Sequence, residues 1–180
     1  MLLIVDNGSV YTQNLIDFLK EKNISFEKIS PNELELKSLE KYDSFILSGR
    51  RKNEKKINQI NSKVIIHSVQ NNKKLLGICY GAEILALTLG GTIRNISSLQ
   101  KGNETINILK NNFISCGSLV VFESHRFEIS KLPDELISLA ESKNCRYEII
   151  QYEQKSIFGT QFHPEMSQDG HDLIEKFCSL

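Results

Sequence analysis

The chain contains the segment Leu75-Leu76-Gly77-Ile78-Cys79-Tyr80-Gly81-Ala82-Glu83. Its apolar start predicts a buried strand, and the apolar residues at 82–89 predict a compact helix. The two glycines that flank Cys79 suit a sharp turn, because glycine has no Cβ to clash there. This pattern is the thiol counterpart of the G-x-S-x-G turn that presents a nucleophile between a strand and a helix. We therefore predict a strand–turn–helix unit with Cys79 at its turn.

The segments before this unit alternate in the same way. Apolar runs at residues 2–5, 24–29 and 45–47 predict strands, and helical spacing around 15–19 and within 53–72 predicts helices between them. Such alternation is typical of parallel βαβ units with right-handed crossovers.

The pattern changes after residue 91. A final helix is predicted at about 168–178, and β-like runs precede it at 104–109, 118–122, 136–140, 146–152 and 156–162. We expect a single α/β domain over residues 1–180, with a mostly parallel central sheet flanked by helices and a small antiparallel β extension.

Composition excludes several classes of protein. The 180 residues are 40% hydrophobic and 24% charged, with zero formal net charge. This length can bury a real core, and the balanced charge argues against a large nucleic-acid or membrane surface. No apolar run approaches the ~20 residues of a membrane span, and residues 1–8 do not resemble a secretory signal. The four cysteines form no CxxC motif, so we expect a cytoplasmic protein with free thiols and no metal site.

A second motif follows the last predicted strand, where the chain reads Phe162-His163-Pro164-Glu165. A nucleophilic thiol needs a base that takes its proton and later protonates the leaving group, and His163 suits that role. Glu165, two residues later, is spaced to orient the imidazole. The backbone N–H of Tyr80, at the start of the helix, is expected to stabilise an oxyanion.

Each motif alone has a simpler interpretation. A cysteine in a glycine-rich turn is more often a packing residue, and a His-x-Glu pair is more often an exposed pair. Their combination favours a catalytic Cys79, His163 and Glu165. The other cysteines, Cys116, Cys145 and Cys178, lack a nearby histidine and acid, so we interpret them as packing residues.

These motifs together resemble the class I (triad) glutamine amidotransferase family, over nearly the whole chain. Within it, residues 5–13, Ile46-Leu47-Ser48-Gly49 and Glu123-Ser124-His125 are similar to the GMP synthase branch, in particular to the separate glutaminase subunit of the archaeal type. Tyr80 also favours that branch over anthranilate and aminodeoxychorismate synthases, which usually carry Leu there.

The resemblance implies a flavodoxin-like fold and a glutaminase that needs no cofactor. Cys79 would attack L-glutamine, His163 would transfer protons, and Glu165 would orient the imidazole. Backbone N–H groups at Gly49 and Tyr80 would form the oxyanion hole. The ammonia would pass to a separate ATP-pyrophosphatase (synthetase) subunit that aminates XMP. The glutamine would be held by residues of two segments, namely Glu83, Ser124, His125, Arg126 and Phe127.

The chain departs from the family's pattern at three places. Gly-Pro usually follows Ser-Gly, where this chain has Arg50-Arg51-Lys52-Asn53, and Glu83 stands where the family usually has Gln. The Asp that GMP synthases commonly show after the histidine is absent from Arg126-Phe127-Glu128. We put forward the hypothesis that Glu83 and Arg50 or Arg51 compensate each other, so that Glu83→Gln alone changes the KM for glutamine.

Several alternatives stay open at this point. The chain could serve another amination pathway, act as a γ-glutamyl hydrolase, or be a diverged, non-catalytic domain that regulates a partner. The basic residues 50–56 are more simply a solvated loop, and otherwise a docking patch for an acidic partner.

Overall fold

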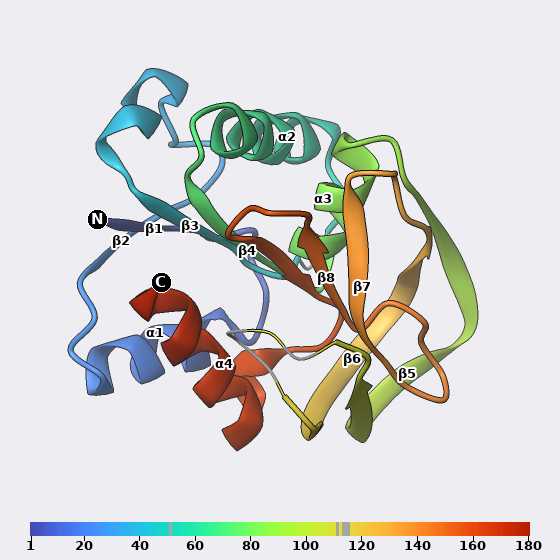
Figure 1. Cartoon of the computed structure of the whole chain (residues 1–180). Coiled ribbons are helices and arrows are strands. Elements are labelled where there is room, and N and C mark those ends of the chain that lie inside the picture. The colour runs from blue at the N-terminus through green and yellow to red at the C-terminus, as the bar shows by residue number, and fades with distance from the viewer. Residues whose placement is uncertain (51, 111, 113–115) are drawn as a thin grey trace.

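The computed structural model describes residues 1–50, 52–110, 112 and 116–180. Its helices and strands follow the order predicted for the first half of the chain (Figure 1). These elements are β1 (Leu2–Val5), α1 (Thr12–Glu21), β2 (Phe26–Ile29), η1 (Leu36–Lys41), β3 (Ser44–Leu47), α2 (Lys55–Gln70), β4 (Lys74–Ile78) and α3 (Tyr80–Thr88). The second half comprises β5 (Thr92–Ile108), β6 (Ser118–Lys131), β7 (Leu136–Glu141), β8 (Ile149–Tyr152), β9 (Ile157–Thr160), η2 (Pro164–Met166) and α4 (Gln168–Ser179).

Within the described residues, the strands form one sheet in the order β2-β1-β3-β4-β9-β8-β7-β5-β6. The strands from β2 to β9 in this order pair in parallel, and those from β8 onward pair antiparallel. The predicted mostly parallel α/β fold with an antiparallel extension is therefore confirmed. The extension is longer than predicted, because β5 and β6 together form a long hairpin.

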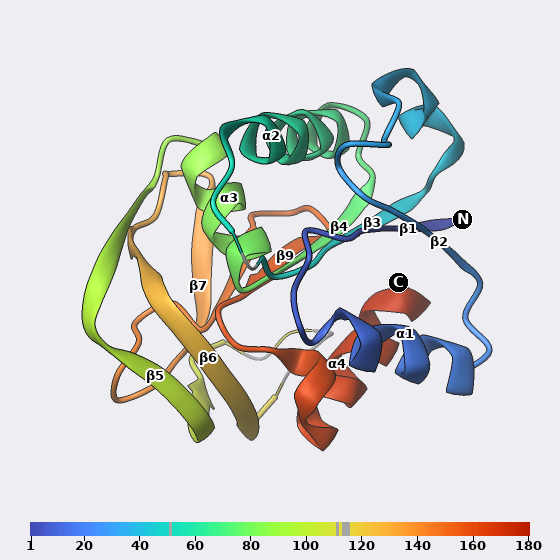
Figure 2. The same ribbon diagram turned by 180° about the vertical axis from the view of Figure 1, so that it is seen from behind.

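Helices cover both faces of the parallel part, with α1 and α4 on one face and α2 and α3 on the other (Figure 2). The strand residues alternate between these layers, as a period of two requires. Ile4 and Ile46 belong to the core cluster that includes Leu15 of α1 and Phe177 of α4. Their neighbours belong to the cluster that includes Val64 of α2 and Leu85 of α3, and these neighbours are Leu3, Val5, Phe45 and Leu47. The sheet is therefore buried on both faces.

The parallel strands all point toward one edge of the sheet. β1, β3, β4 and β9 end at Val5, Leu47, Ile78 and Thr160. Because open α/β sheets bind ligands beyond the carboxyl ends of their strands, the segments that follow these four strands are where a functional site is expected.

Candidate active site

Cys79 occupies the turn between β4 and α3, as predicted. Its backbone has φ 50° and ψ −102°, which lies outside the regions that side-chain-bearing residues ordinarily occupy. Strain of this kind persists where the surrounding structure enforces it, and it gathers at functional sites. The Cys79 N–H donates to the Thr160 carbonyl at 2.7 Å, which ties the turn to the end of β9.

The two glycines of the turn are required by space. A Cβ on Gly77 would lie 2.4 Å from the carbonyl carbon of Gly81, and one on Gly81 would lie 2.4 Å from the Leu47 carbonyl oxygen. Both distances are shorter than real Cβ contacts allow, and both partners are backbone atoms. The G-x-C-x-G pattern thus lets α3 start directly against β3 and β4.

His163 and Glu165 form a buried pair just beyond β9. The His163 Nδ1 lies 2.9 Å from Glu165 Oε1, and both side chains are at most 4% exposed. The His163 N–H donates to the Phe122 carbonyl at 2.8 Å, and the Tyr11 ring packs edge-on with its centroid 4.6 Å from that of the imidazole. With Nδ1–H donated to the carboxylate, Nε2 is left as the basic nitrogen.

Gly49 lies against the imidazole. A Cβ at this position would come within 2.9 Å of His163 Cε1, so the loop after β3 reaches the end of β9 without a side chain between them. This loop is anchored by buried polar groups: the Asn7 N–H donates to Ser48 Oγ at 2.9 Å, and Ser48 Oγ donates to the Gly49 carbonyl at 2.9 Å.

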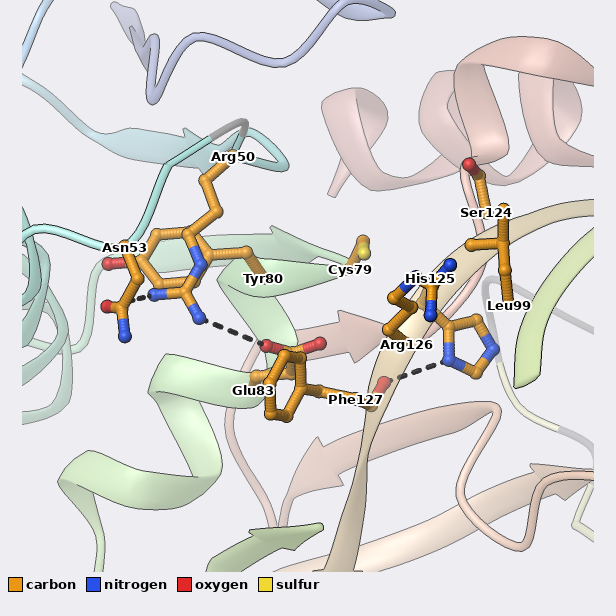
Figure 3. Close-up of a pocket in the computed structure, with 10 residues that line it drawn as sticks. All are labelled: Arg50, Asn53, Cys79, Tyr80, Glu83, Leu99, Ser124, His125, Arg126 and Phe127. Atoms are coloured by element: carbon orange, nitrogen blue, oxygen red, sulfur yellow. Dashed lines mark hydrogen bonds and ion pairs between the residues drawn. The ribbon is translucent and has the colours of Figure 1, made fainter. Parts of the chain in front are cut away.

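A pocket of about 390 Å³ opens beside Cys79 (Figure 3). Both segments that were assigned to glutamine binding from the sequence contribute to its wall. The lining residues are Arg50, Asn53, Cys79, Tyr80, Glu83, Leu99, Ser124, His125, Arg126 and Phe127. The structure thus brings Glu83 and residues 124–127 to one cavity with Cys79, while Gly49, His163 and Glu165 lie at the adjoining strand ends.

Glu83 is a buried carboxylate in this pocket. Burial raises its pKa, and the nearby Arg50 guanidinium opposes that rise. The Arg50 Nη2 lies 4.0 Å from Glu83 Oε2, and the two side chains are 15% and 5% exposed. The hypothesis that Glu83 and Arg50 compensate each other in charge is therefore consistent with their proximity. Arg51, the other candidate, lies outside the described residues.

His125 is held from both sides of its ring. Nδ1 lies 2.8 Å from the Phe127 carbonyl oxygen and Nε2 lies 3.1 Å from Glu123 Oε2. The Nδ1 contact has hydrogen-bond geometry, whereas the Nε2 contact is a close approach to a carboxylate oxygen without that geometry; the nearby negative charge favours the protonated ring. Burial lowers the pKa of His125, but its contacts with the Glu123 carboxylate and the Phe127 carbonyl outweigh this effect and raise it. His125 thus fixes the strand segment that lines the pocket.

The Cys79 thiol is disfavoured from ionising. Burial raises its pKa well above the ordinary value, and the carboxylates of Glu83, Glu123 and Glu165 raise it further. The site therefore has a neutral thiol just after β4 and a buried imidazole just after the neighbouring β9, and an imidazole is a suitable acceptor for a thiol proton.

The sequence did not predict two residues that line the pocket, and it wrongly predicted the burial of one cysteine. Leu99 and Asn53 line the pocket, but neither belongs to a recognised motif. The packing role expected for Cys116 is wrong, because this residue is exposed; Cys145 is buried and Cys178 is half-buried.

In the described part of the chain, no group of three or more His, Cys, Asp or Glu side chains is placed to hold a metal ion. The same residues include no helix long and apolar enough to cross a membrane.

Comparisons with known proteins agree with this geometry. Residues 3–179 match the model of the family "Glutamine amidotransferase class-I". The chain is 32% identical to the glutamine-hydrolysing GMP synthase subunit of Thermococcus kodakarensis, covering 100% of this chain and 98% of that protein. It is 29% identical to the corresponding subunit of Thermoplasma acidophilum, covering 99% and 92%.

A solved structure extends the comparison to three dimensions. The crystal structure of a candidate GMP synthase subunit from Thermoplasma acidophilum superposes with a TM-score of 0.87 at 26% identity, covering 99% of this chain and 92% of that one. Family model, curated relatives and fold all converge on one assignment. The chain belongs to the class I glutamine amidotransferase family.

Proposed function

We propose that this chain is the glutaminase subunit of a two-subunit GMP synthase. It hydrolyses L-glutamine to L-glutamate and ammonia, and a separate synthetase subunit uses the ammonia to aminate XMP. The observation that carries the proposal is the strained Cys79 turn, which lines the pocket and is bonded to the end of β9, with the buried His163–Glu165 pair just beyond that strand. The curated relatives that are named as glutamine-hydrolysing GMP synthase subunits support the choice of acceptor.

The first half of the reaction forms a thioester. His163 Nε2 takes the thiol proton as the Cys79 sulfur bonds to the side-chain amide carbon of glutamine, and the carbonyl oxygen becomes an oxyanion. The backbone N–H groups of Tyr80 and Gly49 donate to that oxyanion. The C–N bond then breaks, and the nitrogen takes the proton from the His163 imidazolium and leaves as ammonia. Glu165 stabilises the imidazolium through Nδ1.

The second half releases glutamate. His163 takes a proton from a water molecule, whose oxygen attacks the thioester carbon and forms a second oxyanion at the same donors. The carbon–sulfur bond breaks, and the proton returns to the Cys79 sulfur. The raised pKa of Cys79 suits this cycle, because the resting thiol loses its proton only when His163 accepts it.

The proposal also includes the organisation and location of the chain. We infer one domain over residues 1–180, since a single family model spans residues 3–179 and one sheet links both halves. The pocket holds glutamine through Glu83, Ser124, His125, Arg126 and Phe127, and the chain needs no cofactor of its own. A cytoplasmic location agrees with the free Cys79 thiol that the chemistry requires.

The test measures release of glutamate and ammonia by the purified chain, alone and with the synthetase subunit, ATP and XMP. Cys79→Ala is expected to lower glutamine turnover by at least ~10³-fold, because the nucleophile is lost. Cys116→Ala, at an exposed cysteine that does not line the pocket, is the matched control and should keep wild-type turnover. Substantial turnover in folded Cys79→Ala, or no glutamate release by the wild type beside an active synthetase, would contradict the proposal.

A further inference from the structure

The loop between β3 and α2 carries an arginine that turns inward. Arg50 directly follows Gly49, yet its side chain is only 15% exposed and it lines the pocket. Lys52, Lys55 and Lys56 of the same basic stretch are exposed. An inward arginine needs partners for its charge and its N–H groups, and these partners indicate what Arg50 does.

The guanidinium of Arg50 contacts three parts of the chain. Nη1 donates to Asn53 Oδ1 at 2.7 Å within the loop, and to Asn58 Oδ1 on α2 at 3.2 Å. Nη2 faces Glu83 on α3 at 4.0 Å. The guanidinium also lies over the Tyr80 ring, with its central carbon 4.2 Å from the ring centroid (Figure 3). Arg50 therefore links the loop to α2 and to the first turn of α3.

Tyr80 is held by the same group of residues. Its hydroxyl donates to Asn58 Oδ1 at 2.7 Å, the same oxygen that accepts from Arg50. Burial raises the pKa of Tyr80 to about 12, so this hydroxyl stays a donor at ordinary pH. Since Tyr80 directly follows the nucleophile, the contacts of Arg50 reach both ends of the expected oxyanion hole.

The Arg50–Glu83 pair is also needed electrostatically. Glu83 is 4% exposed, and a buried carboxylate without a nearby cation is costly. A guanidinium can pair with this carboxylate, stack on an aromatic ring and bond two amides at once, which a lysine ammonium cannot do. The arginine therefore suits both Glu83 and its loop position.

We propose that Arg50 is a positioning residue that fixes the Gly49 loop against Tyr80 and α3, so that the two backbone donors keep the spacing that an oxyanion requires. This inference rests on the proposed glutaminase function. Gly49 is already held by Ser48 on one side and packs against His163 on the other. The backbone at Arg50 also forms a β-bridge with Gly8, and the Arg50 side chain connects the loop to Tyr80 and Glu83, which follow the nucleophile.

The proposal predicts a loss in kcat, measured at saturating glutamine. Oxyanion donors act on charge that develops only in the transition state, so loosening one leaves substrate binding almost unchanged. Arg50→Met, which keeps the length of the side chain, should lower kcat by about 10- to 100-fold, since removal of a whole donor costs roughly 10²–10³. A change in KM is expected beside this loss, because Arg50→Met leaves the Glu83 carboxylate unpaired in the glutamine pocket.

The experiment measures kcat and KM together with amide hydrogen exchange in peptides covering residues 44–58. Variants are Arg50→Met, Arg50→Lys and the control Lys52→Met, which removes an exposed cation of the same loop. Arg50→Met should lose protection in these peptides together with kcat. Arg50→Lys should recover part of both, because it restores the charge that faces Glu83. Lys52→Met should stay within about twofold of wild type.

The outcomes separate this inference from the proposed function. A wild type without glutamine turnover beside its synthetase would overturn the proposed function, while hydrogen exchange would still report whether Arg50 holds the loop. Wild-type kcat in Arg50→Met would overturn the inference. So would a lower kcat with unchanged protection, because it would indicate a direct role for Arg50.

Discussion

At the scale of single residues, the Cys79 thiol is surrounded by groups that oppose its ionisation. Burial is the main cause, and the Glu83 carboxylate is the next largest. Glu83 also belongs to the first turn of α3, where the partial positive charge of a helix N-terminus would otherwise favour a thiolate. The resting state is therefore a thiol, and in the proposed mechanism its proton is transferred to His163 during the chemical step.

This arrangement predicts the effect of Glu83→Gln on thiol reactivity. Loss of the carboxylate should lower the Cys79 pKa, so alkylation by iodoacetamide at pH 8 should become roughly three- to tenfold faster, since one pKa unit changes the thiolate fraction about tenfold. Modification of the Cys79 peptide is followed by mass spectrometry in a Cys116→Ser background, because Cys116 is exposed. Glu175→Gln, at an exposed carboxylate paired with Lys22, is the control. An unchanged or slower rate in Glu83→Gln would contradict this account.

At the scale of elements, the contact between β3 and α3 leaves no room for a side chain at Gly81. A Cβ there would lie 2.4 Å from the Leu47 carbonyl oxygen, so Gly81→Ala must push α3 away from the sheet. We expect a loss of about 3 kcal/mol or more in unfolding free energy, at the upper end of single substitutions. Gly90→Ala is the matched control: Gly90 has φ +98° but nothing within 4 Å of the position that a Cβ would take, so it should cost about 1–2 kcal/mol. Equal losses in urea unfolding would show that packing at the turn is not decisive.

The elements differ in how well the sequence predicted them. β1, β3 and β4 are buried apolar runs, and this apolar pattern was sufficient to predict them as strands. β5 was predicted only from residue 104, because its first twelve residues are mostly polar and exposed. Strand pairing with β6 holds this segment in place, and such pairing leaves no local apolar signal. Leu99, in that part of β5, was therefore missed as a pocket residue.

The candidate site shows the same difference between local sequence patterns, which predict residues well, and contacts between distant segments, which they do not predict. Cys79, His163 and Glu165 were predicted as catalytic residues because each motif is local and its residue types suit one chemistry. The contacts of Arg50 with Asn58 and Tyr80 join residues 8 and 30 positions apart, across a loop and two helices. Spacing along the chain contains no signal for such contacts, so only the charges of Arg50 and Glu83 suggested a link.

At the scale of the whole molecule, the antiparallel extension buries several carboxylates. Glu128 pairs with Arg94 at 2.7 Å, and Glu123 faces His125 at 3.1 Å. Glu148, just before β8, is fully buried. Burial raises the pKa of Glu148 to about 9, and the Glu123 carboxylate adds to the rise. Glu148 is therefore protonated in the folded protein at neutral pH, whereas in the unfolded chain it is ionised.

This difference makes global stability depend on pH. Between about pH 4.5 and pH 9 the folded state holds a proton on Glu148 that the unfolded state has released, so the free energy of unfolding falls as the pH rises. The neutral Glu148→Gln removes that dependence. At pH 8 it should raise stability by more than about 1 kcal/mol, or roughly 2–4 °C in Tm for a chain of this size. At pH 5 most of this gain should be absent, because this pH lies only about half a unit above the ordinary glutamate pKa of 4.5, so releasing the proton stabilises the unfolded chain only slightly.

Thermal unfolding at pH 5, 6.5 and 8 measures this effect, with the exposed Glu153→Gln as control for loss of a surface charge. The raised pKa of His125 acts in the same direction: its stabilising contribution is present below about pH 6.5 and is lost as the pH rises through its folded-state pKa. Because His125 is unchanged in both variants, the comparison isolates Glu148. A Tm difference between Glu148→Gln and wild type that is the same at pH 5 and pH 8 would show that Glu148 is ionised in the folded protein.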